Sequence, residues 1–420
     1  MELHVEMVSE EIVKPSSSTP DPLRCYRLSF IDQLTPSQYN TFIYFYPEIC
    51  DTDKITISDR LKQSISDALT YFYPLAGRMI EDQLFVDCND EGIPFVEARV
   101  KCQLSDVLNI PIPKELNKLL PFQIHCEHKV LLGIQFNVFD CGGIGIGVCV
   151  SHKIGDALSF FSFVKLWAAI ARGETKLMAP EFESASLFPP RDLLTPGPRI
   201  SELKTGQLIT KRFVFGATKV EEIRTYSENS TQTRPTRVEA LSAFIWDRLI
   251  VAIGARSKLD TLFMIVHTVN LRPRIEPRLP ESSFGNFVSI ALTIPSMDSN
   301  MVPQMRESIK AVDEEYVKKL QDGYNHLDGF REKAASYGKG ETAVFLFTSL
   351  CRFPLYEADF GWGKPIWAGS GDREMKNVTT FMDTITGDGI EAWITLSEED
   401  MAKFDSDEEL LKYIQIPKSL

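Results

Sequence analysis

The segment from His152 to Asp156 constrains the fold most, because it separates a strand-like run from a helix-like run. Residues 144–150 alternate small and bulky apolar side chains, which is typical of a buried strand. Residues 157–172 are apolar on nearly every face, as expected for a buried helix. Asp156 is placed to cap the first turn of that helix. We therefore expect an α/β fold in which His152 lies where a strand gives way to a helix, at the rim of a crevice.

His152 is the candidate general base, because imidazole titrates near neutral pH and can remove a proton from a hydroxyl or amine. A histidine at a strand end can equally be a structural residue, so this position alone does not decide the matter. Asp156 could orient His152, as carboxylates orient the histidines of hydrolases. It could also serve only to cap the helix and hold the bend, and the pattern favours that second role.

Two other chemistries are possible near His152, and the pattern argues against both. The glycines between residues 142 and 147 suggest a dinucleotide-binding loop, but their segment continues as a strand and does not open a helix. Such glycines more often let a ligand or another strand approach the backbone. Cys149 and Ser151 are candidate nucleophiles, yet neither lies in a G-x-S-x-G elbow, and Ser151 should face away from His152 on an alternating strand.

Length and charge narrow the possible functions. The chain has 420 residues, which is long for one compact core and suits two domains. Its net charge of −13 argues against a nucleic-acid partner. None of the eight cysteines forms a C-x-x-C pair, so we predict reduced core cysteines and no metal site. With no apparent secretory signal or membrane-spanning run, we expect a cytoplasmic protein with no membrane partner.

A proline-rich stretch divides the chain. Prolines cluster between residues 180 and 206, so this segment should be neither a regular helix nor a central strand. We predict an N-terminal domain over residues 1–178, a crossover loop over 179–210 and a C-terminal domain over 211–420. The patterns predict strands over 27–30, 131–139, 144–150, 211–215, 262–269, 287–294, 379–383 and 389–396. They predict helices over 58–72 with Ser58 as a cap, 157–172, 236–254 with a capping box at Thr236, 302–326 and 397–404.

Two further segments stand out. Arg272, Arg274 and Arg278 form a basic run in an acidic chain, and they suit contact with phosphates, contact with a buried carboxylate, or simply a solvated loop. The segment Asp359–Gly363 contains Phe360 and Trp362 together with two glycines, and by itself it indicates a tight structural loop.

Taken together, these segments resemble the BAHD family of plant coenzyme-A-dependent acyltransferases. The resemblance covers nearly the whole chain, and residues 14–20 and 30–33 are most similar to the branch of alkaloid acetyltransferases. It rests on HKIGD at 152–156, DFGWGKP at 359–365, YPLAGR at 73–78, DCND at 87–90, NLRPR at 270–274, FGN at 284–286 and GDGIEAW at 387–393.

The resemblance implies two α/β domains of similar topology with mixed sheets, as in chloramphenicol acetyltransferase, separated by a solvent channel. Coenzyme A would enter from one side and the acceptor from the other, with His152 between them. It also implies that Asp156 points away from the site and pairs with Arg274. The loop of Asp359, Gly361, Trp362 and Gly363 would be structural. Possible coenzyme A contacts are Arg272, Asn286, Thr348 and Ser349.

The implied reaction is transfer of acetyl from acetyl-CoA to a hydroxyl of an alkaloid or related molecule, by a monomer with no permanently bound cofactor. His152 would take the hydroxyl proton and no acyl-enzyme would form. Thr348, Ser349 and Trp362 are candidates for stabilising the oxyanion. The alternatives are another acyl-CoA, an amine, terpenoid or phenolic acceptor, or a non-catalytic relative that binds small molecules.

Overall fold

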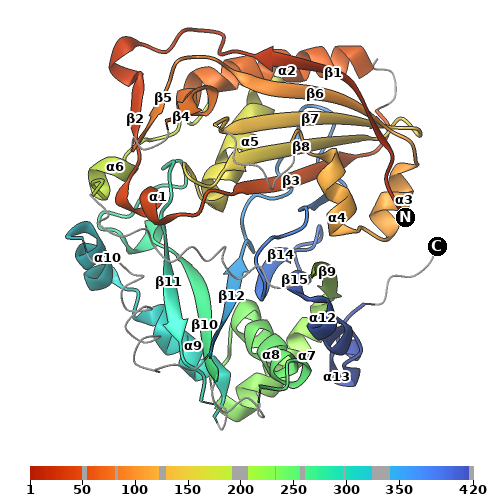
Figure 1. Ribbon diagram of the computed structural model, residues 1–420, viewed down its shortest axis with the longest axis vertical. Helices are drawn as coiled ribbons and strands as arrows, with labels where there is room; N and C mark the ends of the chain where they lie inside the picture. The colour runs from red at the N-terminus through yellow and green to blue at the C-terminus, as the bar shows by residue number, and fades with distance from the viewer. Residues whose placement is uncertain are drawn as a thin grey trace.

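The computed structural model describes residues 1–49, 54–80, 84–122, 129–191, 207–231, 233–255, 261–296, 299–323 and 341–415. Two six-stranded sheets lie one above the other in Figure 1, each with helices packed against it. Each sheet mixes parallel and antiparallel neighbours, as the family resemblance implied. A small sheet of β2 (Cys25–Arg27), β5 (Phe85–Asp87) and β4 (Arg78–Met79) lies beside the upper one.

The upper sheet contains the strand that leads to His152. Its order is β1 (Val5–Val13), β6 (Ile93–Val100), β7 (Leu132–Phe139), β8 (Ile144–Ser151), β3 (Tyr39–Tyr46) and β13 (Trp367–Gly369). β6 and β7 run parallel, and the other neighbours are antiparallel. Phe42 of β3 packs on Phe160 and Phe161 of α5 (Ala157–Ala171), which fixes this helix against the sheet. α2 (Lys54–Tyr71) lies next to α5.

The lower sheet is built from the second half of the chain. Its order is β11 (Val288–Thr293), β10 (Thr261–Asn270), β12 (Glu341–Ser349), β14 (Val378–Asp383), β15 (Ile390–Ser397) and β9 (Leu208–Phe215). β12 runs parallel to both β10 and β14. Trp246 of α8 (Arg237–Ala252) contacts Phe263 and Phe345, so this helix covers one face of the sheet.

The remaining helices are short or lie at the periphery (Figure 1). They are α1 (Phe30–Leu34), α3 (Leu104–Asn109), α4 (Pro113–Leu116), α6 (Ser184–Leu187), α7 (Ala217–Thr231), α9 (Met301–Lys310), α10 (Glu314–Gln321), α12 (Glu398–Asp405) and α13 (Glu408–Leu411). None of the helices within these described ranges is both long and apolar enough to cross a membrane.

The second half of the chain contributes to both sheets. β13 pairs with β3, and Trp367 stacks on Phe45 of that strand with ring centroids 5.4 Å apart. Trp367 also stacks on Trp393 of the lower sheet, with ring centroids 6.1 Å apart. These aromatic contacts join the two sheets.

Most predicted elements are confirmed, and three details are wrong. Phe30 begins α1 and does not continue a strand, because Ser29 and Asp32 form a capping box. Ser58 lies inside α2 and donates to Glu97 at 2.7 Å, so it does not cap the helix. Asp313 caps a second helix, which splits the predicted helix over 302–326 into α9 and α10. The end of that prediction, and residues 192–206 of the predicted crossover, lie outside the described residues.

Gly147 of β8 allows another segment to lie directly on the strand. A Cβ at this position would come 2.1 Å from the backbone oxygen of Leu119, whereas a Cβ at Gly145 would meet Phe139 at an ordinary 3.4 Å. Of the two roles that the sequence left open for these glycines, the Gly147 geometry supports close approach of another chain segment.

We predict that Gly147→Ala destabilises the protein by about 2 kcal/mol or more, because the backbone of Leu119 must move. Gly145→Ala is the matched control on the same strand and should change the free energy of unfolding by less than about 1 kcal/mol. Denaturant unfolding of both variants measures this. Equal effects of the two substitutions would contradict the steric explanation.

Candidate active site

A cavity of about 170 Å³ lies between the two sheets and contains His152. Its walls come from β3, from the start of α5 and from β10, β12 and β14. The loop between β13 and β14 adds Arg373 to the wall. The cavity therefore draws residues from both halves of the chain, as expected for a site between two lobes.

Backbone hydrogen bonds hold His152 in place. Its N–H donates to the carbonyl of Gln38 at 2.8 Å, and its carbonyl accepts from Nδ2 of Asn286 at 2.8 Å. Nδ1 is buried with no hydrogen-bond partner among the residues described, and the His152 side chain lines the cavity. Burial is the largest effect and lowers the pKa of the imidazole below its ordinary value; the charge of Asp156 acts to raise this pKa, and the charge of Arg373 acts more weakly to lower it. The ring is therefore neutral at pH 7.

Asp32 stabilises the loop that carries His152 through a hydrogen bond to Asn286. Its buried carboxylate accepts from the backbone N–H of Ser29 at 2.7 Å and from Nδ2 of Asn286 at 2.7 Å. Burial raises the pKa of this carboxyl. Nζ of Lys153 donates to the backbone oxygen of Asp32 at 3.3 Å, so the lysine next to His152 points away from the cavity chemistry. Asn286 thus bridges Asp32 and His152, and this contact gives it a positioning role.

Asp156 makes a buried, two-pronged ion pair with Arg272. Nη1 and Nη2 of Arg272 donate to the two carboxylate oxygens at 2.7 and 3.0 Å, and both residues are about 97% buried or more. The carboxylate also accepts from the backbone N–H groups of Ser159 and Phe287. Burial alone would raise the pKa of Asp156, but Arg272 and these amides outweigh it and hold the pKa below its ordinary value.

The predicted pairing of Asp156 with Arg274 is wrong. The two arginines lie on one 3₁₀ turn (Arg272–Arg274), where residues two apart point in different directions. Arg274 points toward the end of α9 and donates to the carbonyls of Ile309 and Val312. Arg272 occupies the place that the family resemblance had given to Arg274. It is thus committed to Asp156, and it also donates to the carbonyl of Ser283 at 2.9 Å.

Ser159 and Gly285 complete this junction between the halves. The hydroxyl of Ser159 donates to the carbonyl of Gly285 at 2.9 Å and accepts from its N–H at 3.0 Å. The N–H of Asp156 donates to the same carbonyl at 3.2 Å. Gly285 has φ +144°, and a Cβ there would meet Ser184 at 2.7 Å, so glycine is needed at this crossing.

The Asp359–Gly363 loop lies away from the cavity and has structural contacts. Oδ1 of Asp359 accepts from the N–H groups of Gly361 and Gly363 at 2.8 and 3.0 Å. Trp362 packs edge-on against Tyr46 of β3. The backbone oxygen of Asp359 accepts from Arg172 at the end of α5. These contacts agree with the structural role predicted for the loop and leave Trp362 outside the cavity.

Three threonines form a polar row across the cavity wall, on β10, β12 and β14: Thr268, Thr348 and Thr380. Thr348 and Thr380 are direct neighbours in the parallel pairing of β12 and β14. The hydroxyl of Thr268 donates to that of Thr348 at 2.8 Å. Ser349 also lines the cavity. The sequence analysis identified Thr348 and Ser349, but it missed Thr268 and Thr380, whose partners are visible only once the strands are paired.

Cys149, which the sequence analysis weighed as a nucleophile and argued against, is unsuited to that role. Cys149 is fully buried, and burial raises the pKa of its thiol well above the ordinary value, so a thiolate is disfavoured. No group of metal-ligating side chains occurs within the described ranges.

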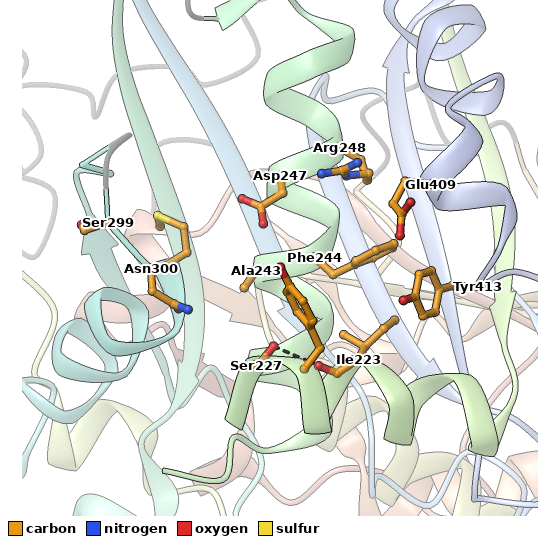
Figure 2. Close-up of a pocket in the computed structure, with 12 residues that line it drawn as sticks. Ile223, Ser227, Ala243, Phe244, Asp247, Arg248, Ser299, Asn300, Glu409 and Tyr413 are labelled. Atoms are coloured by element: carbon orange, nitrogen blue, oxygen red, sulfur yellow. Dashed lines mark hydrogen bonds between the residues drawn. The ribbon is translucent and has the colours of Figure 1, made fainter. Parts of the chain in front are cut away.

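A larger hollow of about 390 Å³ lies in the lower half between α7, α8, α9 and α13, where Phe244 packs on Tyr413. Figure 2 shows Asp247, Arg248 and Glu409 around it but no histidine.

We predict that Arg272→Met destabilises the protein far more than Arg274→Met. The first leaves Asp156 buried and unpaired, which typically costs about 3–5 kcal/mol. The second removes hydrogen bonds to two neutral carbonyls, which are worth about 1–2 kcal/mol together. Urea unfolding of both variants provides the measurement. A larger loss at Arg274 would show that the pairing described above is not the one that stabilises the fold.

Comparison with known proteins agrees with this fold. A model of the Transferase family matches residues 3–411. A limonoid 21-O-acetyltransferase of Citrus sinensis is 40% identical over 429 residues, covering 98% of both chains. Vinorine synthase of Rauvolfia serpentina is 38% identical over 414 residues, covering 95% of both.

The crystal structure of vinorine synthase superposes with a TM-score of 0.85 at 36% identity, covering 98% of this chain and 99% of that one. TRI101 of F. sporotrichioides, crystallised with coenzyme A and T-2, shares the fold with a TM-score of 0.70 at 18% identity, covering 93% and 99%. The predicted family and fold class are confirmed. The chain therefore belongs to the BAHD transferase family and is an acyltransferase.

Proposed function

We propose that this protein transfers acetyl from acetyl-CoA to a hydroxyl group of a specialised metabolite. The observation that carries the proposal is the position of His152 in the wall of a cavity built from both halves of the chain. Relatives of similar identity acetylate limonoids, or are named as alkaloid acetyltransferases such as stemmadenine O-acetyltransferase of Catharanthus roseus. Both classes of acceptor are thus open. TRI101, a distant structural neighbour, was crystallised with coenzyme A.

The proposed reaction takes place in one ternary complex. Nε2 of His152 accepts the proton of the acceptor hydroxyl while the oxygen attacks the thioester carbonyl. The tetrahedral intermediate then collapses, the carbon–sulfur bond breaks and the electrons leave with the sulfur of coenzyme A. Protonated His152 returns the proton to this thiolate, so the products are the ester and free coenzyme A. No acyl-enzyme is needed, because the hydroxyl attacks directly.

Asp156 has a positioning role in this proposal. In a serine hydrolase triad the carboxylate accepts a hydrogen bond from the histidine ring. Here both carboxylate oxygens are engaged by Arg272 and by two backbone N–H groups. The ion pair therefore holds the loop that carries His152, and the ring works without a carboxylate partner.

Thr348 is the proposed donor to the oxyanion. Its hydroxyl oxygen accepts a hydrogen bond from Thr268 at 2.8 Å, so its own proton is free to point into the cavity. A donor that also accepts is polarised by its partner and donates more strongly. Thr348 lies on β12, on the wall supplied by the second half of the chain, whereas His152 comes from the first half.

We further propose that the enzyme acts as a monomer in the cytosol. The cavity takes its residues from one chain, so no second copy is needed to build the site. The cysteines in the described part of the chain are free, as is usual in a reducing compartment.

We predict that His152→Ala lowers kcat by about 10²–10⁴-fold or more with little change in melting temperature. The acceptor is found by incubating purified protein with acetyl-CoA and an extract of the source tissue, and by following the mass increase of the products. His4→Ala is the control, because this histidine is exposed and does not line the cavity. Full turnover by the folded His152→Ala protein would refute the proposed role.

We predict that kcat/KM falls on acidification through a pKa below 6.5, because His152 acts in its neutral form and burial lowers its pKa from that ordinary value. The plateau should therefore cover neutral pH and extend below it. A pH–rate profile with excess acetyl-CoA measures this. An apparent pKa well above 7 would show that the proton-accepting group is a different one.

We predict that Thr348→Val lowers kcat by about 10²-fold with a much smaller effect on the KM for either substrate, because an oxyanion donor acts mainly in the transition state. Thr348→Ser retains the hydroxyl and should keep most of the activity. Steady-state kinetics of both variants distinguish the cases. A change confined to KM would assign Thr348 to substrate binding.

A further inference from the structure

Arg373 places a positive charge in the cavity that has no protein partner. It lies on the loop between β13 and β14 and lines the same cavity as His152. Its guanidinium forms no hydrogen bond and no ion pair with any residue that the structure describes. A guanidinium remains protonated in proteins, so the charge is present at all working pH values.

The carboxylates around Arg373 are otherwise engaged. Asp372, the carboxylate that acts electrostatically on Arg373, accepts hydrogen bonds from the hydroxyl of Thr210 and from the backbone N–H of Arg373. Asp156 is held by Arg272. Glu374 also lines the cavity, but it is exposed and forms no ion pair with Arg373. The positive charge of Arg373 is therefore available to interact with a ligand that enters the cavity.

Arg373 is half-buried in the wall of the cavity. A charged group in a cleft that has no protein partner commonly serves ligand binding. Arginines with a structural role in this chain have carboxylate partners. Arg272 and Arg212 each donate two hydrogen bonds to a carboxylate.

The position of Arg373 indicates which substrate it meets. The thioester carbon must lie beside His152 for the proposed reaction, and the whole pantetheine arm separates that carbon from the phosphates of coenzyme A. Arg373 and His152 line the same cavity of about 170 Å³. The phosphates therefore lie too far along the cofactor to reach Arg373. An oxygen-rich or anionic group near the reacting end has to come from the acceptor.

We propose that Arg373 selects the acceptor by binding a carboxylate or carbonyl oxygen near the acylated hydroxyl and by repelling protonated amines. This inference rests on the proposed acyl transfer and deepens it. Of the two acceptor classes left open above, it favours an oxygen-rich, non-basic molecule over one with a basic nitrogen. A cation within a few ångströms of Arg373, in a medium less polar than water, would be strongly disfavoured.

Three single-ring alcohols of similar size and different charge test the proposal. They are trans-4-hydroxycyclohexanecarboxylate, its methyl ester and trans-4-(aminomethyl)cyclohexanol, which suit a cavity of about 170 Å³. Isothermal titration without an acyl donor measures binding to the wild-type protein and to Arg373→Gln. At pH 7.5 we expect the carboxylate to bind at least about tenfold more tightly than the amine, with the ester between them. In Arg373→Gln this difference should largely vanish.

Two control variants distinguish the loss of the Arg373 charge from a general structural effect of substitution. Arg373→Lys keeps the charge and should retain the order of affinities, and Arg278→Gln removes an exposed arginine and should leave all affinities unchanged. Equal preferences in wild type and Arg373→Gln would overturn the proposal. So would a failure of the carboxylate to bind the wild type, or a raised Kd for acetyl-CoA in Arg373→Gln with the acceptor order intact. Because binding is measured without turnover, inactive but discriminating protein would contradict only the proposed acyl transfer.

Discussion

The buried ion pair of Asp156 and Arg272 is the interaction on which the site depends. It joins the start of α5 in the first half of the chain to the 3₁₀ turn after β10 in the second half. Removing either partner leaves a buried charge uncompensated, which costs far more than the intact pair contributes. The pair is therefore weak evidence for high stability but strong evidence for a fixed geometry. With Ser159 and Gly285 beside it, the two halves meet in one arrangement at the cavity.

This constraint explains how His152 is held without a carboxylate on its ring. The loop is anchored at both ends, by Asp156 on the helix side and by the hydrogen bond from His152 to Gln38 on the strand side. Asn286 then links the carbonyl of His152 to buried Asp32. The position of the imidazole is thus set through its backbone. Its proton affinity is set separately, by burial and by the charges around it.

Local patterns predicted the strand, the histidine and the buried helix because each depends on residues close in sequence. Asp156 caps α5 as its position before an apolar run indicated, and its carboxylate accepts from Ser159 at 2.9 Å. The choice between Arg272 and Arg274 could not be predicted in this way. It depends on which side of a single turn faces the other half of the chain. The position of Arg373 in the cavity could not be predicted either, because an arginine in an irregular loop belongs to no periodic pattern.

Burial, more than the charges around the cavity, keeps His152 in the neutral form in which a base works. The charge of Asp156 acts to raise the pKa of the ring, and Arg373 acts more weakly in the opposite sense. The same guanidinium opposes the imidazolium that forms during the reaction, so an anionic acceptor group bound to Arg373 would relieve that repulsion as the proton moves. Acceptor recognition and proton transfer are then coupled: a correctly charged acceptor makes His152 a stronger base at the moment when the hydroxyl is in place. An acceptor with a protonated amine would have the reverse effect, because it adds a second positive charge where the imidazolium must form.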